Sequence, residues 1–393
     1  MTIAGTSETT ARAGHRPPVF LSRGRSATTQ SIVDIAAFLP ELVERTGSDN
    51  PFFEADFLAP AAEVLGTTLE LTTVNDASGR LLAMLPTKRI RLGRVAPSLR
   101  AFSHDYAPLG VPLVDASTTR SSAAALIDGA LERAGPSTGL VLPELVETDP
   151  VTDAVRIAAR SSGRSVTIID RYQRAGLDRE RDGTNPRESL SKRRRKEYAR
   201  QLHRMGAEGP VVFEHAVTQA DIMQRFEDFV TLESSGWKGR RRTALAANPL
   251  IADFARNAVR GLARRSSASI VTLRIGDHPA AILICLHHGH TAFTWKIAYD
   301  EALSPFSPGA QVMLEAPRFL FANATTKRID SCATGNHPMV DHIWAGRLQM
   351  STMVIGPAQK RWRNRLGIAS HRAETAIRRT ATNARNALLS PRR

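Results

Sequence analysis

One stretch in the last third of the chain places a strand, a turn and a helix in an order that suits phosphate binding. A strand is expected at Thr291–Tyr299, and an amphipathic helix runs from Gly309 to about Asn323. Glycine leaves room for a pyrophosphate, and bare N–H groups at a helix start attract anions. The predicted cofactor contacts are Ser307, Pro308, Gly309, Ala310 and Gln311. Pro-Gly pairs also open ordinary turns before helices, and this alternative stays open.

A carboxylate is expected on the buried side of another helix. Residues 221–235 have an apolar stripe that includes Ile222, Phe226 and Phe229, and Glu233 falls on the same stripe. A buried carboxylate must be paired, hydrogen-bonded or functional. Glu233 is therefore the first candidate for a general base, and satisfaction by loop backbone is the structural alternative.

The residues after Glu233 combine an aromatic ring, cationic side chains and glycine, as ligand-shaping loops often do. The predicted substrate-binding residues of this loop are Trp237, Lys238, Gly239 and Arg240.

Side-chain alternation along the strand before the turn predicts two different faces. The apolar face is expected to carry Phe293, Trp295, Ile297 and Tyr299. The other face presents Lys296 and Asp300, which suits a strand that lines a cleft. Lys296 could then bind an anionic acceptor or the phosphates of a donor. An edge strand with a solvated face is the alternative.

Four further residues are candidates for proton transfer. Asp300 and Asp341 follow Glu233 as possible bases, and Tyr299 is a possible acid although the predicted apolar face argues against it. His337 follows Gly335-Asn336 and could act as a base without a large pKa shift, with a surface or backbone-bonded histidine as the alternative. No metal is expected, because no cluster has metal-ligand spacing, and no Ser-His-Asp or Cys-His motif occurs.

Composition predicts a soluble, globular protein with two lobes. The 393 residues are 42% hydrophobic and 23% charged. The chain has neither an apolar run long enough for a membrane span nor a signal-peptide core, so a cytoplasmic location is expected. Cys285 and Cys332 suit free thiols in a reducing compartment.

The net charge of +15 is concentrated in three segments. Residues 1–31 carry four Arg and one Glu, and residues 358–393 carry ten Lys or Arg and one Glu. A predicted helix near 189–206 carries Lys192, Arg193, Arg194, Arg195, Lys196, Arg200 and Arg204. Such a helix is usually a solvated face, and it could also attract anionic acceptors, a membrane surface or a phosphate of a cofactor. For the C-terminal segment a flexible basic tail is expected, with peripheral contact to anionic lipid as the alternative and no specific nucleic-acid partner.

The predicted domains are a disordered tail at 1–31, a mixed α/β lobe at 32–180, a second domain at 181–357 and the basic tail at 358–393. The polar segment 174–185 is expected to link the two lobes. Both lobes show a helix followed by strand pairs without a sequence repeat, so a duplicated architecture is possible.

Several motifs resemble one family when they are taken in order. Across residues 189–344 they are SLSKRRRKEYARQLHRMG, LESSGWKGR, WKIAYDEALSPFSPG and RIDSCATGNHPMVDHIW, and the first lobe contributes HDYAPLGVPLVD. Together they resemble the CelD-like (cellulose biosynthesis-associated) branch of the GNAT acyltransferases, with its BioF2-like acetyltransferase domain. The resemblance covers about residues 32–357.

The resemblance implies a two-lobed GNAT acyl-CoA N-acyltransferase fold of α/β (α+β) class, with a mixed, mostly antiparallel sheet flanked by helices. It also implies acetyl-CoA or another acyl-CoA as co-substrate and transfer to an amine or hydroxyl of a cell-envelope or polysaccharide precursor. The pyrophosphate would contact residues 307–311. In this loop only Gly309 matches the Gln/Arg-x-x-Gly-x-Gly/Ala pattern of ordinary GNAT enzymes, so another activated donor stays open.

Two alternatives remain. A Fem-like aminoacyltransferase would use aminoacyl-tRNA, and its basic helix would contact RNA phosphates. A catalytically inactive GNAT-fold binding protein would keep the loop and Glu233 for structure alone.

Overall fold

The computed structural model describes residues 20–21, 26–27, 36–65 and 69–389, with side chains to residue 377. The strands are β1 (Phe20–Leu21), β2 (Ser26–Ala27), β3 (Leu69–Asn75), β4 (Leu81–Leu92), β5 (Ala96–Ala101), β6 (Leu113–Val114), β7 (Gly139–Val146), β8 (Val166–Asp178), β9 (Val211–Ala216), β10 (Ala268–Ile275), β11 (His278–His288), β12 (Thr291–Tyr299), β13 (Arg328–Asp330) and β14 (Arg347–Ile355). The α-helices are α2 (Leu39–Arg45), α3 (Ala55–Val64), α4 (Thr119–Ala134), α5 (Pro150–Ser161), α6 (Arg179–Asp182), α7 (Lys192–Met205), α8 (Gln219–Ser235), α9 (Trp237–Arg240), α10 (Pro249–Arg264), α11 (Pro308–Leu320) and α12 (Arg361–Leu389). The 3₁₀ helices are η1 (Pro51–Phe53), η2 (Ala116–Thr118), η3 (Pro186–Ser189), η4 (Leu245–Ala247), η5 (Glu301–Phe306) and η6 (Val340–His342). The N-terminal tail predicted at 1–31 lies almost wholly outside the described residues.

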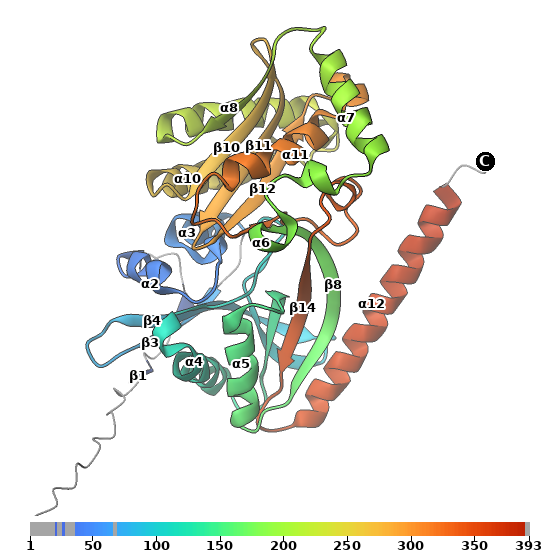
Figure 1. Cartoon of the computed structure of the whole chain (residues 1–393). Helices are drawn as coiled ribbons and strands as arrows, with labels where there is room; N and C mark the ends of the chain where they lie inside the picture. Colours follow the sequence, from blue (N-terminus) through green and yellow to red (C-terminus); the bar gives the residue numbers. More distant parts are fainter. Residues whose placement is uncertain (1–19, 22–25, 28–35, 66–68, 390–393) are drawn as a thin grey trace, which may run out of the picture.

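The strands of the described residues form one mixed, mostly antiparallel sheet with two similar halves. In the first lobe, β3, β4 and β5 form an antiparallel meander, and β7 returns through α4 to lie parallel to β5. In the second lobe, β10, β11 and β12 form the same meander, and β13 returns through α11 to lie parallel to β12 (Figure 1). The structure therefore has the duplicated architecture that the sequence left open.

The two lobes exchange strands at the centre of the sheet. β8 follows β7 in the chain, but its last residues, Gly176–Asp178, pair with β13 of the second lobe. β14 follows β13 in the chain, but it pairs with β7 and runs along β8. The polar segment expected as a linker thus begins inside a central strand, and the last strand of the predicted domain 181–357 completes the sheet of the first lobe.

A buried ion network explains why a linker-like composition occurs in a central strand. The Arg174 guanidinium is almost fully buried, 3.2 Å from a carboxylate oxygen of Asp330 and 2.9 Å from one of Glu144. It also donates to the carbonyl oxygen of Pro108 at 3.0 Å. Because a buried charge must be compensated, these partners make a polar strand possible here. The network fastens β8 to β7, to β13 and to the HDYAPLG segment.

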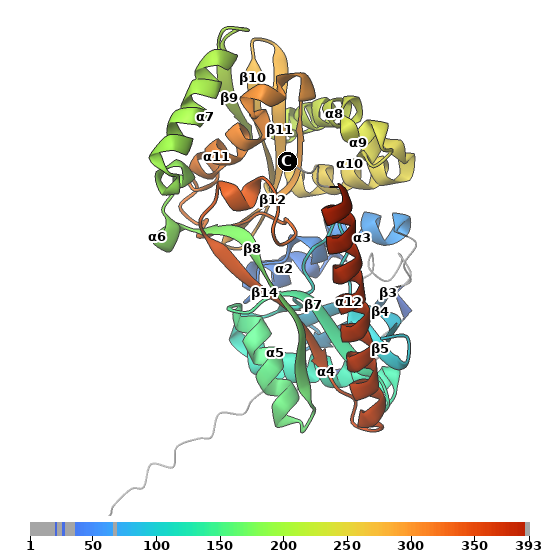
Figure 2. The ribbon, with the colours of Figure 1, turned by 90° about the vertical axis from the view of Figure 1, so that its right-hand side faces the viewer.

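Helices cover both faces of the sheet. One large core contains side chains of α4 and α5 in the first lobe and of α8 and α10 in the second. The opposite face is covered by α7 and α11 in the second lobe and by α12 in the first (Figures 1 and 2). Most of segment 358–393, which was expected to be a flexible tail, therefore lies in the long helix α12 (Arg361–Leu389), with one face on the sheet.

A β-bulge changes the predicted faces of β12. Thr294 pairs with Cys285 and Lys296 pairs with Ile284, so Trp295 is an extra residue. Phe293 and Trp295 pack in the large core, whereas Ile297 and Tyr299 contact the cluster beneath α11. The prediction of one apolar face through all four residues was wrong, because one extra residue reverses the alternation.

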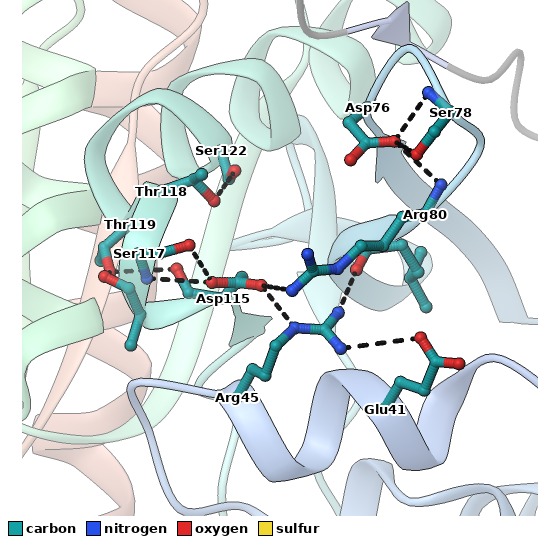
Figure 3. A network of polar contacts seen from close by, with 12 residues as sticks. Glu41, Arg45, Asp76, Ser78, Arg80, Asp115, Ser117, Thr118, Thr119 and Ser122 are labelled. Carbon is teal, nitrogen blue, oxygen red and sulfur yellow. Dashed lines mark hydrogen bonds and ion pairs between the residues drawn. The ribbon is translucent and has the colours of Figure 1, made fainter. Parts of the chain in front are cut away.

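The last residue of the first-lobe motif, Asp115, caps η2. Asp115 accepts hydrogen bonds from the N–H and hydroxyl of Ser117 in η2, which leads directly into α4. The same carboxylate pairs with Arg45 at 2.8 Å and Arg80 at 3.4 Å (Figure 3). Burial by itself would raise the pKa of Asp115, but these hydrogen bonds and the Arg45 charge hold it below its usual value.

Candidate functional site

A cavity of about 460 Å³ lies between α7 and α11 in the second lobe. It is lined by Arg194, Glu197, Tyr198, Gln201, Tyr299, Ser304, Ser307, Pro308, Gly309, Ala310, Pro338, Met339 and His342. Four of the five residues predicted to bind the cofactor are in this lining. The volume falls in the range of ligand pockets in proteins.

The start of α11 opens into this cavity without a side-chain cap from the described residues. Ser307 has a φ of 54° and is left-handed, and Pro308 occupies the first helical position. Helix geometry leaves the N–H groups of Gly309 and Ala310 without acceptors inside the helix. They are the donors that an anionic ligand of the cavity would meet first.

Gly309 and Gln311 have packing roles that the sequence did not show. A Cβ atom at position 309 would lie 3.1 Å from Cδ1 of Tyr299, so a side chain there would press on the Tyr299 ring where α11 approaches β12. The Gln311 amide accepts from Arg187 at 3.1 Å and donates to the carbonyl of Tyr198 at 2.8 Å. The N–H of Gln311 donates to the carbonyl of Ser307 at 3.0 Å. Gln311 therefore holds α11 against α7 and does not line the cavity.

Helix α7 supplies one cation, Arg194, and one carboxylate, Glu197, to the lining of the cavity. Arg194 lies in the lining and donates to the carbonyl of His342 at 2.7 Å. The sequence indicated α7 only as a charged run. Tyr198, on the apolar stripe of α7, marks the face that packs on the lobe, and Arg194 lies one turn earlier on the same face. The stripe could thus have identified which of the seven cations lies at the site.

A second, smaller hollow adjoins Tyr299, which also lines the main cavity. Its lining is Leu232, Glu233, Gly236, Trp237, Lys238, Ile297, Ala298, Tyr299 and Glu301. Glu233 is 4% exposed and both its oxygens are engaged, one by Nζ of Lys238 at 2.7 Å and one by the N–H of Leu245 at 2.8 Å. Proton transfer through Glu233 would require one of these bonds to open.

The predicted loop after Glu233 forms the short helix α9, which folds back on α8. A Cβ atom at Gly239 would lie 1.8 Å from the carbonyl oxygen of Ser234, so only glycine fits there. Glu301 accepts from the N–H of Trp237 and pairs with Arg240, which ties the loop to η5. The Trp237 ring is 42% exposed. Sequence reasoning missed Glu301, whose role appears only once η5 is placed beside α9.

Lys296 turns toward the first lobe. Its Nζ lies 4.1 Å from the ring centre of Tyr106, and Nε1 of Trp295 donates to the carbonyl of Tyr106 at 2.8 Å. Burial, with a smaller effect of Lys238, lowers the pKa of Lys296 to about 8. Burial also raises the pKa of Tyr106. Sequence reasoning found Lys296 but not Tyr106, which lies almost two hundred residues earlier in the HDYAPLG segment.

Three predicted acid–base residues do not line either hollow. Asp300 accepts from the N–H of Ala302 and lies 2.8 Å from Nε2 of His278, so it closes the end of β12. Nδ1 of His337 accepts from two backbone N–H groups at the start of η6, and burial lowers its pKa. Asp341 lies on η6, and its backbone carbonyl accepts from Arg347.

Residues 192–337 match the family model of the acetyltransferase (GNAT) domain. The C-terminal domain of a protein assigned as a lysylphosphatidylglycerol synthetase from Agrobacterium fabrum is similar in structure, with a TM-score of 0.53 and 12% identity over 88% of this chain and 96% of that chain. FemX is similar with a TM-score of 0.51 and 10% identity over 86% and 98%. A protein of unknown function from Bacteroides thetaiotaomicron has a TM-score of 0.51 and 11% identity over 85% and 99%. No curated protein matches the chain.

The predicted fold class is confirmed: the chain has a GNAT-type α/β fold with a mostly antiparallel sheet flanked by helices. The narrower CelD-like resemblance stays a prediction. Within the described ranges, no helix is long and apolar enough to cross a bilayer. Both cysteines are free, and no group of three His, Cys, Asp or Glu side chains in the described part of the chain could hold a metal ion.

Proposed function

We propose that this protein transfers an acyl group from an acyl-CoA, such as acetyl-CoA, to an amine or hydroxyl acceptor. The observation that carries the proposal is the cavity at the uncapped start of α11, within the residues that match the GNAT acetyltransferase family. The pyrophosphate would accept from the N–H groups of Gly309 and Ala310, with Arg194 at the rim. The pantetheine arm would then run toward Tyr299.

The chemistry needs three actions at the junction of the two hollows. The acceptor nitrogen attacks the thioester carbonyl, a base takes its proton, and the departing CoA thiolate receives a proton. Tyr299 is our candidate acid because it lines both hollows. Glu233, paired with Lys238, is our candidate base.

The acceptor would enter from the side of α9 and Lys296. A cell-envelope or polysaccharide precursor is the acceptor class that we propose, since the resemblance to CelD-like proteins implies one. The half-exposed Trp237 ring suits stacking against a sugar or another flat group. Lys296 is cationic below about pH 8 and could hold an acidic group of the acceptor.

Titration calorimetry with acetyl-CoA and longer acyl-CoAs tests the proposal. We expect micromolar dissociation constants, a loss of about tenfold or more in Arg194→Gln, and no binding in Gly309→Asp, which adds bulk and negative charge at the helix start. Arg193→Gln is the matched control, because Arg193 is the exposed neighbour of Arg194 and does not line the cavity. A folded wild-type protein that binds no CoA thioester would refute an acyl-CoA donor.

The exposed basic face of α7 favours one second candidate, aminoacyl transfer from aminoacyl-tRNA. Tight binding of aminoacyl-tRNA that weakens steeply with salt, without binding of acyl-CoA, would support it. A catalytically inactive binding protein is a third outcome. Turnover of an acceptor that survives Glu233→Gln would show that Glu233 is not the base, and turnover that survives Tyr299→Phe would show that Tyr299 is not the acid.

A further inference from the structure

Helix α12 exposes an apolar stripe along the side that faces away from the protein. Trp362, Leu366 and Ile377 are 61%, 50% and 69% exposed. Exposed Ala369 and Ala373 fill the helical spacing between them. Because these positions recur every three to four residues, they lie in one row on the helix surface. A large aromatic ring and two branched side chains in one exposed row are unusual on a free surface.

The opposite side of α12 fixes this orientation. Asn364, Gly367 and Ile368 are buried against the first lobe. A Cβ atom at Gly93, in the β4–β5 turn, would lie 2.2 Å from the carbonyl oxygen of Gly367. The two glycines allow the helix backbone to touch the turn, so the helix cannot rotate to bury its apolar stripe. Within the part of the chain that the structure describes, nothing covers that stripe.

Arginines flank the stripe on both sides. Arg361, Arg365 and Arg372 follow one edge of the stripe, and all three are exposed. Two of them also donate to first-lobe carbonyls, Arg361 to Gly163 and Arg372 to Ile168, which holds their stems along the body. Arg363 lies on the other edge with its guanidinium 5.3 Å from the ring centre of Trp362. The covering surface must therefore be apolar inside and negatively charged at its boundary.

The one acidic side chain of this segment is paired with an arginine of the first lobe. Glu374 is the single acidic residue between positions 358 and 393. It is turned toward the body and lies 2.8 Å from Nε of Arg94. The exposed side of the described part of α12 is thus purely apolar and cationic, which is the pattern of a helix that lies in the interface of an anionic bilayer.

We propose that α12 binds an anionic lipid bilayer, with the Trp362–Ile377 stripe in the headgroup region and the flanking arginines on lipid phosphates. Tryptophan prefers this boundary because its ring is apolar while its N–H remains hydrated. A second copy of the chain is a poorer partner, since pairing two such helices would bring their arginine rows together in a dry interface. The proposal does not depend on the enzymatic activity.

Flotation with vesicles of phosphatidylglycerol and phosphatidylcholine in equal parts, against pure phosphatidylcholine, tests this inference. We expect the full-length protein to float with the anionic vesicles and to be released by high salt. Leu366→Gln and Trp362→Gln should each weaken binding about tenfold, because each removes an apolar side chain from the bilayer. Leu250→Gln on α10 is the matched control, since Leu250 is 61% exposed far from α12.

Two double variants distinguish the contribution of α12 to vesicle binding from that of α7, the other basic helix. Arg363→Gln with Arg365→Gln should lower the affinity about twentyfold or more, whereas Arg193→Gln with Arg195→Gln on α7 removes the same charge and should change it little. Circular dichroism confirms that each variant is folded. Absence of flotation with anionic vesicles, equal losses in both charge variants, or a dimer in light scattering that Leu366→Gln dissolves would each overturn the proposal.

Discussion

The two lobes share one architecture but differ in the segment that precedes each crossover helix. In the first lobe, Asp115 caps η2 before α4 and is held by Arg45 and Arg80 (Figure 3). In the second lobe, Asp300 caps η5, and Ser307 then precedes α11 in a left-handed conformation. Neither α4 nor α11 has a side-chain cap, but the start of α11 faces a cavity. The halves thus have the same fold, and the proposed ligand site lies at the start of α11.

Two buried cations, Arg174 and Lys296, differ in how fully neighbouring charges compensate them. Burial opposes the charge of Arg174, but Asp330 together with Tyr172, Cys332 and Glu144 outweighs burial, and the pKa of Arg174 is raised. Burial also opposes the charge of Lys296, and there the pKa falls to about 8 because Glu233 compensates it only in part. A site that must receive an outside charged group has to leave charge uncompensated, and this costs stability.

The largest expected effect comes from removing the buried carboxylate of Asp115. Asp115→Ala removes a buried carboxylate from two arginines and from the Ser117 N–H, so the free energy of unfolding should fall by about 3 kcal/mol. Urea unfolding at pH 7 measures it. Asp76→Ala is the control, because partly exposed Asp76 accepts the same two bonds from Ser78 and one from the backbone N–H of Arg80. It should cost less than about 1 kcal/mol. Equal losses in the two variants would show that burial of Asp115 contributes nothing.

Lys296, whose charge is compensated only in part, should make the free energy of unfolding depend on pH. Lys296→Met should raise the free energy of unfolding by about 2 kcal/mol at pH 7, since it removes the cost of a buried charge. The folded pKa of about 8 lies below the ordinary value of 10.5, so the unfolded wild type binds more protons between these pH values. Wild-type stability should therefore rise from pH 8 to pH 10.5, and the advantage of the variant should shrink over that range.

Chemical unfolding at pH 7, 9 and 10 measures the stability difference between Lys296→Met and the wild type. Lys192→Met, at an exposed lysine, is the control and should show a difference that does not change with pH. A stability difference for Lys296→Met that stays constant across the same range would mean that folding does not lower the pKa of Lys296.

Local patterns in the sequence predicted the elements around the cavity but not how they meet. β12 spans the predicted residues Thr291–Tyr299, and α8 ends at the predicted Ser235. The Ser307–Ala310 turn was predicted because glycine and helix periodicity are local signals. The bulge at Trp295, the exchange of β8 and β14, and the contact of Tyr106 with Lys296 depend on partners that are distant in the chain. Periodicity along one segment carries no information about such partners.

Strand β8 and helix α12 also could not be predicted from local patterns in the sequence. The polar composition around Arg174 predicted a linker. Arg174 can lie in the core only because Asp330 and Glu144 form ion pairs with it. The C-terminal segment has a weak apolar pattern, since two faces of α12 each carry only part of it. Its docking depends on Gly93 and Gly367, and this close approach of two backbones leaves no signal in either sequence segment.

The smallest expected effect tests the open helix start directly. Ser307 has a left-handed backbone, which is strained for a residue with a side chain. Ser307→Gly removes this strain, which costs about 1 kcal/mol. Part of the gain is lost because glycine has greater freedom in the unfolded chain. We expect a net stabilisation of about 0.5 kcal/mol in urea unfolding, with acyl-CoA affinity nearly unchanged because Ser307 does not cap the helix. Arg242→Gly, at an exposed residue with a φ of 56°, should give a similar gain. Deleting the side chain before α4 should thus cost stability, while deleting the one before α11 should add it. A loss of about 1 kcal/mol or more in Ser307→Gly would show that the Ser307 side chain stabilises the start of α11, and the contrast between the lobes would fail.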